Sequence, residues 1–120
     1  MKKLLLAFAI MFGLAILTSC KKESQDNTKQ QTITPNIKKN ELFKYEFGLI
    51  GLEDNMFISQ QANHFEKSEL KRDNTGRIIY TYKPSLNYVG TDEVEVSLGI
   101  SNGATIINTI KSKIKLTITN

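Results

Sequence analysis

Polar and apolar residues alternate along most of the chain after residue 41, and this period of two predicts β-strands that bury one face. Two segments show the pattern first: residues 43–49 carry Phe, Tyr, Phe and Leu at odd positions, and residues 78–82 carry Ile, Tyr and Tyr at even positions. The run Asp73-Asn74-Thr75-Gly76 lies between them and is rich in turn formers. It predicts a hairpin immediately before Arg77.

The last thirty residues show the clearest alternation in the chain. Apolar residues occupy the even positions of 94–100, and Asn102-Gly103 is a strong hairpin signal. After this turn, most even positions from 106 to 118 are apolar, while the odd positions from 109 to 119 carry Thr and Lys. This parity predicts one long strand, or two strands in phase across a bulge near Asn108.

Residues 59–72 are ambiguous. Ile58, Ala62, Phe65 and Glu69 follow helical spacing. The same window contains the good helix formers Gln60, Gln61, Glu66, Lys67 and Leu70. Taken alone, the window favours a short helix. Its alternation is poor for a strand, so helix and strand both stay open at this point.

The segment from residue 20 to 40 is polar, with Ile33 and Ile37 as its only sizeable apolar side chains. Such a composition buries too little apolar surface to offset the entropy lost on ordering, so it predicts a flexible tether. A tether of roughly 20 residues has an r.m.s. span of about 25 Å. Residues 41–120 then form a single small domain.

The N-terminus carries Lys2 and Lys3, an apolar run over residues 4–17, and the sequence Leu17-Thr18-Ser19-Cys20. This order resembles the signal peptide of bacterial lipoproteins, with Leu17, Thr18, Ser19 and Cys20 matching the lipobox. The resemblance implies removal of residues 1–19, lipid attachment at Cys20 and anchoring in the outer membrane. The run is shorter than a spanning helix needs, and an ordinary secretory signal would leave a free thiol, so both alternatives are less favoured.

Lys21, Lys22 and Glu23 follow the lipobox, and Cys20 is the only cysteine. Lys followed by acidic residues after a lipidated cysteine resembles the signal that exports some lipoproteins to the cell surface. A solvated charged linker is the alternative, so the domain faces either the outside or the periplasm. A lipidated Cys20 leaves no thiol for a disulfide within the chain.

The segment from residue 80 to 94 resembles bacterial immunoglobulin-like (Ig-like) and cadherin-like modules. The matching residues are Tyr82, Pro84, Tyr88, Gly90 and Asp92. The resemblance implies an all-β fold, a single antiparallel β-sandwich over residues 41–120, with loop and strand in the 60–72 window. Physically, a proline ends a strand, a glycine permits unusual backbone angles, an aspartate accepts backbone N–H bonds, and tyrosine hydroxyls reach loop carbonyls.

The sequence offers little for catalysis, metals or cofactors. His64 is the only histidine, no Gly-x-Ser-x-Gly elbow or Gly-rich phosphate loop is present, and zinc lacks ligands. Asp54, Asp92 and Glu93 are too few for calcium, even if they meet at one end of the sandwich. We therefore expect no catalytic residues, no metal and no cofactor.

Lys111, Lys113 and Lys115 form a row on one face of the last strand and are the best candidates for a binding patch. Edge protection of the sheet is the structural alternative, with Glu93 and Glu95 available as partners. Nucleic acid is not the expected partner, because no aromatic residues interleave with these lysines and removal of Lys2 and Lys3 lowers the formal charge of +4 by two. The sequence predicts a non-catalytic, membrane-anchored module that binds a protein or glycan; the alternative is an accessory subunit of an outer-membrane complex.

Overall fold

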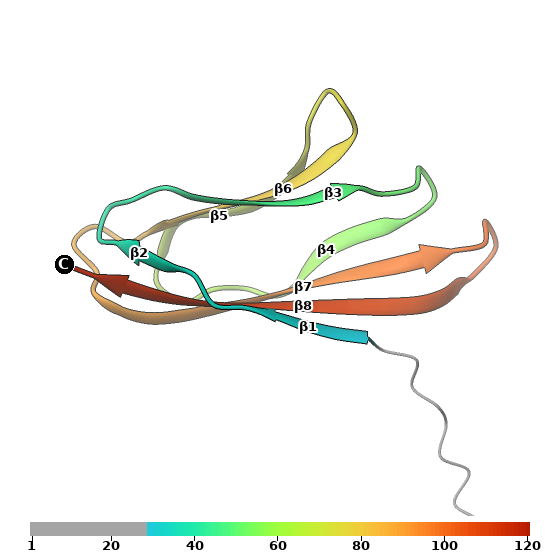
Figure 1. Cartoon of the computed structure of the whole chain (residues 1–120). Helices are drawn as coiled ribbons and strands as arrows, with labels where there is room; N and C mark the ends of the chain where they lie inside the picture. Colours follow the sequence, from blue (N-terminus) through green and yellow to red (C-terminus); the bar gives the residue numbers. More distant parts are fainter. Residues whose placement is uncertain (1–28) are drawn as a thin grey trace, which may run out of the picture.

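The computed structural model describes residues 29–120, which form eight β-strands and contain no helix (Figure 1). The strands are β1 (Lys29–Ile33), β2 (Asn36–Lys38), β3 (Phe43–Leu49), β4 (Asn55–Gln60), β5 (Phe65–Arg72), β6 (Arg77–Pro84), β7 (Gly90–Ser101) and β8 (Ile106–Thr119). Within this part of the chain no helix is long and apolar enough to cross a membrane. The expected all-β class is confirmed.

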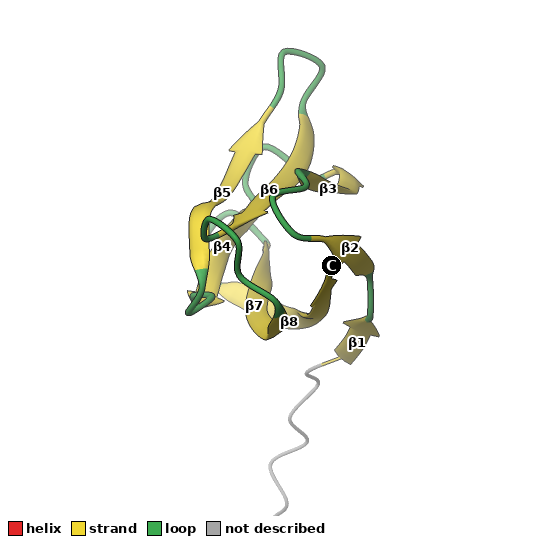
Figure 2. Cartoon of the chain, turned by 90° about the vertical axis from the view of Figure 1, so that its left-hand side faces the viewer, coloured by secondary structure: helices red, strands yellow, loops and turns green. Residues whose placement is uncertain are grey.

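The strands form two sheets that pack face to face (Figure 2). The larger sheet has the order β1-β8-β7-β4, with β2 also pairing with β8, and the smaller sheet has the order β3-β6-β5. Both β1 and β2 run parallel to β8, whereas the other neighbours are antiparallel. The larger sheet is therefore mixed, and the expectation of a purely antiparallel arrangement is wrong for it.

Residues 29–38 belong to the folded domain, so this part of the expected tether is wrong. Lys29 pairs with Ile110 and Ile33 with Ile114, after which Pro35 interrupts the pairing. Pro35 still contributes its carbonyl, which accepts a hydrogen bond from the Thr117 N–H at 3.0 Å. Ile33 and Ile37 are too few apolar residues to predict a strand from the sequence. In the structure β8 supplies the hydrogen-bonding partners for this segment, and both isoleucines then pack in or against the core.

The core lies between the two sheets and consists of the apolar faces that the alternation predicted. Tyr80 and Tyr82 of β6 are completely buried against the inner face of the larger sheet. That face contributes Ile37, Val94, Ile114, Leu116 and Ile118. The predicted alternation is thus confirmed by burial in β6, in β7 from Asp92 to Val96 and in β8 from Ser112 to Ile118. It is wrong at the proximal ends of β7 and β8, where Leu98 and Ile100 are only half-buried and Ile106 is exposed.

Both predicted hairpins are present. Gly76 has φ +88° and precedes β6, while the Asp73 carboxylate accepts hydrogen bonds from the Thr75 and Arg77 N–H groups at 2.8 and 3.0 Å. The β7–β8 turn spans residues 102–105 and has Gly103 at φ +90°. β8 is one continuous strand, and its register against β7 shifts beside Asn108, where the sequence predicted a bulge.

The ambiguous window contains β5, so its strand alternative is correct. β5 is an edge strand that pairs with β6 through the 73–76 hairpin. Its charged side chains suit an exposed edge, and Glu69 lies 3.2 Å from Lys67 and 3.1 Å from Lys71. The polar residues of this window favour a helix when taken alone, because many of them are good helix formers. Pairing with β6 overrides that propensity and makes the segment a strand.

The domain has two distinct ends, which are named here by their distance from residue 29. The proximal end comprises the start of β1 with loops 50–54 and 102–105. The distal end comprises loops 39–42, 61–64 and 85–89 with the C-terminus (Figure 1).

At the proximal end, a bulge between Glu46 and Gly48 shifts the β3 register, and Leu49 becomes exposed. Leu49 therefore departs from the predicted inner face of its strand.

Candidate functional site

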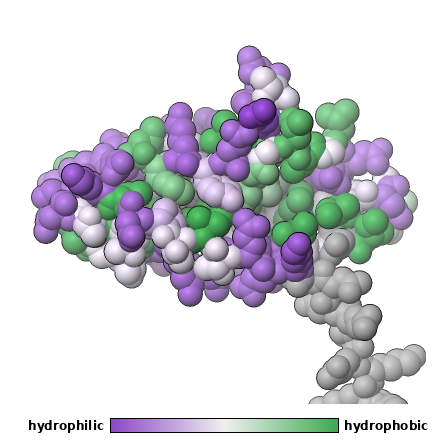
Figure 3. Space-filling view, in the orientation of Figure 1, coloured by the Kyte–Doolittle hydropathy of each residue, from purple (hydrophilic) through white to green (hydrophobic). Residues whose placement is uncertain are grey.

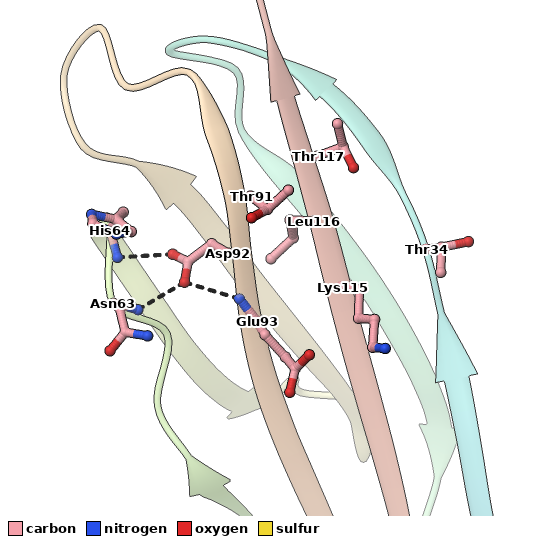
Figure 4. Close-up of a pocket in the computed structure, with 9 residues that line it drawn as sticks. All are labelled: Thr34, Asn63, His64, Thr91, Asp92, Glu93, Lys115, Leu116 and Thr117. Carbon is pink, nitrogen blue, oxygen red and sulfur yellow. Dashed lines mark hydrogen bonds between the residues drawn. The ribbon is translucent and has the colours of Figure 1, made fainter.

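A pocket of about 540 Å³ opens in the distal half of the larger sheet (Figure 4). Its walls come from β7, β8, the β1–β2 connection and the loop between β4 and β5. The lining residues are Thr34, Asn63, His64, Thr91, Asp92, Glu93, Lys115, Leu116 and Thr117. Most of these carry hydroxyl, amide, imidazole or charged groups, so the pocket suits a polar ligand.

Asp92 fixes one wall of this pocket. Its carboxylate accepts hydrogen bonds from the Asn63 and His64 N–H groups at 2.8 and 2.9 Å. It also accepts from the Glu93 N–H at 2.9 Å and from the Tyr82 hydroxyl at 2.8 Å. Asp92 is only 6% exposed, and these contacts tie the β4–β5 loop to β7. The predicted role of Asp92 as an acceptor of backbone N–H bonds agrees with this geometry, although two donors come from a distant loop.

Two tyrosines hold the neighbouring loops. The Tyr82 hydroxyl lies 2.9 Å from the His64 carbonyl, and the Tyr88 hydroxyl donates to the Thr91 carbonyl at 2.7 Å. Burial, reinforced by the Asp92 carboxylate, raises the pKa of Tyr82 well above its ordinary value, so its hydroxyl stays protonated and donates. The Tyr82 contact matches the expectation that these hydroxyls reach loop carbonyls, whereas the Tyr88 hydroxyl reaches a carbonyl at the start of β7.

His64 occupies the β4–β5 loop, and its ring stacks on Tyr88. The ring centroids are 4.3 Å apart with an interplanar angle of 11°. The backbone of His64 is equally constrained, because its N–H donates to Asp92 and its carbonyl accepts the Ser85 N–H at 3.1 Å. The imidazole is therefore a positioned part of the pocket wall.

The lysine row lies on the outer face of β8, but β8 is not an edge. β7 pairs on one side of it and β1 and β2 on the other, so the edge-protection alternative is wrong. Lys113 lies 3.3 Å from Glu93 and Lys111 lies 4.0 Å from Glu95, as predicted for cross-strand partners. Lys115 lines the pocket and makes no ion pair within residues 29–120. The three lysines are thus unequal, and only Lys115 offers an uncommitted ammonium group to the pocket.

The remaining sequence predictions fall into two groups. Cys20, the lipobox residues Leu17, Thr18 and Ser19, and the export-signal residues Lys21, Lys22 and Glu23 lie outside the described residues. Asp54 and Asp92 are at opposite ends of β7, because the Asp54 carboxylate accepts the Ser101 N–H at 3.0 Å. Residues 29–120 contain no group of three or more His, Cys, Asp or Glu side chains able to hold a metal ion.

The pocket itself was not predicted from the sequence. His64 and Lys115 are separated by fifty positions, and no local motif links them. A second hollow of about 310 Å³ lies between the sheets near the proximal end, and its walls include Met56, Leu98 and Ile110. Polar side chains, Gln31 and Ser112, also line this hollow, and nothing in its lining distinguishes it as a binding site.

Comparisons with known proteins identify no family. No family model and no curated protein matches the chain. Among solved structures, the endo-fucoidan hydrolase MfFcnA4 of glycoside hydrolase family 107 has a TM-score of 0.53 and 11% sequence identity, and the match covers 77% of this chain and 13% of that one. This chain therefore spans a small part of the hydrolase, and the similarity concerns the fold alone.

Two further similarities have TM-scores below 0.5. The cysteine protease inhibitor EhICP2 from Entamoeba histolytica has a TM-score of 0.44 and 14% identity, over 76% of this chain and 96% of that one. InlP from Listeria monocytogenes has a TM-score of 0.40 and 11% identity, over 78% of this chain and 28% of that one. The function has to be argued from the residues of this chain.

Proposed function

We propose that this protein is a lipid-anchored, non-catalytic binding module of the outer membrane, with an Ig-like or cadherin-like domain that binds an anionic glycan. The observation that carries the proposal is the polar pocket, in which Lys115 has no ion-pair partner among residues 29–120. The pocket also carries hydroxyl and amide side chains, and its two carboxylates are engaged, Asp92 by hydrogen bonds and Glu93 by Lys113. An ammonium group in such a pocket complements a ligand that bears carboxylate or sulfate groups and many hydroxyls.

The Ig-like or cadherin-like assignment is supported by the residues that first suggested it. Pro84 ends β6, and Gly90 begins β7 with φ +146°. The Tyr82 hydroxyl reaches the His64 carbonyl in the β4–β5 loop, and the Tyr88 hydroxyl reaches the Thr91 carbonyl at the start of β7, in the manner of the tyrosine corner of sandwich domains. Asp92 ties the following strand to a loop from elsewhere in the domain.

A binding role rather than catalysis is supported by how the reactive groups of the pocket are used. The Asp92 carboxylate already accepts four hydrogen bonds, and the His64 ring is stacked on Tyr88. Glu93 is paired with Lys113. A pocket of about 540 Å³ falls within the usual range for small-ligand sites and accommodates a short oligosaccharide segment.

The glycan proposal is tested by Lys115→Gln, with Lys113→Gln as the matched control. Both lysines lie on the same face of β8, but Lys113 is engaged by Glu93. Titration calorimetry with sulfated and carboxylated oligosaccharides should show about tenfold weaker binding for Lys115→Gln, corresponding to one charge-assisted hydrogen bond, and less than about twofold for the control. Equal losses in both variants would indicate general charge attraction, and no loss in either would refute the site.

The anchor is tested separately by Cys20→Ala. This variant should lose metabolic labelling with palmitate and move from the membrane fraction to the soluble fraction, because more than one acyl chain is needed for stable anchoring. Membrane retention without Cys20 would contradict lipidation at that residue. Protease treatment of intact cells then distinguishes an outward-facing domain from a periplasmic one.

A second candidate function is that of an accessory subunit in an outer-membrane complex. It is supported by three exposed apolar residues in the distal loops, Leu42, Leu86 and Val89. The Asn40 side-chain Oδ1 accepts a hydrogen bond from the Asn87 backbone N–H at 2.8 Å and so connects the two loops that carry these residues. Chemical cross-linking in cells should then yield a defined adduct that Leu86→Ser removes and Lys115→Gln leaves intact. The reverse pattern would favour the glycan function.

A further inference from the structure

Exposed apolar side chains gather at the proximal end of the domain (Figure 3). Leu52 is 95% exposed at the tip of loop 50–54, Ile106 is 60% and Ile107 is 58% exposed at the start of β8, and Leu49 is exposed at the end of β3. Single exposed apolar residues are common, but several at one end of a small domain mark a contact surface.

The loops that carry these side chains are held in place by hydrogen bonds. The Asp54 carboxylate accepts the Gly51 N–H at 3.1 Å and the Ser101 N–H at 3.0 Å, which joins loop 50–54 to the end of β7. In the 102–105 turn, the Asn102 side chain accepts the Ala104 and Thr105 N–H groups at 3.0 and 2.9 Å. Leu52 is therefore presented to solvent by a structured loop.

The chain enters the domain at this same end. Lys29 pairs with Ile110, only four positions after the first residue of β8. The nine Cα-to-Cα steps from Cys20 to Lys29 reach at most about 30 Å when fully extended. From Ile110, the start of β8 is four residues or about 13 Å away, and its distal end at Thr119 is nine residues or about 30 Å away. A lipid at Cys20 therefore reaches the proximal loops without full extension of this connection, and the distal loops only when the connection is fully extended.

We infer that the proximal end docks on the lipid bilayer, with Leu52, Ile106 and Ile107 inserted among the lipids and the distal pocket directed away from the membrane. This inference rests on the proposed lipid anchor at Cys20. It concerns apolar insertion into the acyl region and not headgroup electrostatics, because the exposed loop around Leu52 carries the acidic Glu53 and Asp54. Binding should therefore persist on uncharged phosphatidylcholine bilayers.

The distal end provides the matched control, because it also exposes apolar side chains. Leu86 is 77% exposed and Val89 is 47% exposed, both in loop 85–89. Hydrophobicity alone thus does not distinguish the two ends. The position of the chain start does, and the experiment compares Leu52 directly with Leu86.

The test uses the lipidated full-length protein in phosphatidylcholine vesicles that contain spin-labelled lipids. Leu52→Cys and Leu86→Cys each introduce one free thiol, which is labelled with an environment-sensitive fluorophore. Lipid quenching should be at least about threefold stronger at position 52 than at 86, since only the inserted label meets the acyl region. Equal quenching, or stronger quenching at 86, would overturn the docking geometry.

Flotation of the same vesicles separates the two proposals. If the protein does not float with the vesicles, the anchor and the docking inference both fail. If it floats and the two labels are quenched equally, only the docking inference fails.

In a second measurement, Leu52→Ser combined with Ile107→Ser should remove the membrane-dependent protection of residues 50–54 from hydrogen exchange. Leu86→Ser combined with Val89→Ser should retain it. Protection that persists in detergent would indicate contact between protein copies and overturn the inference.

Discussion

Replacing Asp92 with alanine removes the group that ties the β4–β5 loop to β7. The carboxylate accepts three backbone N–H bonds and one hydroxyl bond, all between 2.8 and 2.9 Å, and it is almost fully buried. Alanine accepts none of these bonds. The donors on Asn63, His64 and Glu93 would then depend on water that enters the pocket.

The expected cost follows from how well each donor finds a new partner. The Tyr82 hydroxyl still has the His64 carbonyl at 2.9 Å, so its loss is small. Three N–H groups lose a charged acceptor, which is worth about 1.5–3 kcal/mol each when no replacement exists. Because Asn63 and His64 are exposed to water, we discount this to about 1 kcal/mol each and expect Asp92→Ala to cost about 3 kcal/mol in the free energy of unfolding.

Urea denaturation followed by tyrosine fluorescence measures this cost. With a slope of about 1 kcal/mol per molar urea for a small domain, the midpoint should fall by about 3 M. Asp54→Ala is the matched control, because Asp54 accepts only two backbone N–H bonds, in the proximal loops, and should cost about 1 kcal/mol. Equal midpoint shifts for the two variants would refute the argument that Asp92 is the main polar tie of the domain.

Three further predictions address the core and the backbone. Burial raises the pKa of Tyr80 to about 12 and that of Tyr82 further, so the folded state keeps protons that the unfolded chain releases near the ordinary pKa of 10.0. The contribution of these tyrosines to stability should be constant below pH 10 and should fall as the pH rises toward 12, with a shallower fall in Tyr82→Phe. An unchanged slope in that variant would contradict this. Gly90→Ala should cost about 2 kcal/mol in thermal unfolding, since φ is +146° and the new Cβ would lie 2.8 Å from the Tyr88 hydroxyl; a neutral effect would mean that the turn rearranges freely. Ile37→Ala should cost about 2–3 kcal/mol in urea titrations because β2 is part of the core, whereas a loss below about 0.5 kcal/mol would place β2 outside it.

Much of the fold was predictable because its strands show period-two alternation that matches their burial. The inner faces of β6, β7 and β8 were identified from parity alone, and Gly76 and Gly103 marked both hairpins. The prediction failed where a strand depends on a partner far away in sequence. β2 contributes one buried isoleucine, Ile37, and is recognisable only once β8 is in place beside it.

The candidate site was predictable only in parts. Asp92 and Tyr82 were identified as structural residues, since a buried aspartate after a glycine and a tyrosine before a proline have clear local roles. The grouping of His64 with Lys115 in one pocket was not predictable from the sequence. The loop that carries His64 and the strand that carries Lys115 come together only through the β4–β7 and β7–β8 pairings. The lysine row was seen from parity, but the ion pair that distinguishes Lys113 from Lys115 depends on cross-strand register.

The sequence by itself determined the strand class, the inner faces and the hairpins, because alternation and turn chemistry are local properties of the chain. The tertiary structure alone decided that residues 29–38 join the sheet, that β8 is flanked on both sides, and that one lysine of three lines a pocket. These features depend on which strands become neighbours. Neighbours are chosen by the collective burial of the inner faces, and this choice also brings the start of the domain beside its exposed leucine and isoleucine side chains.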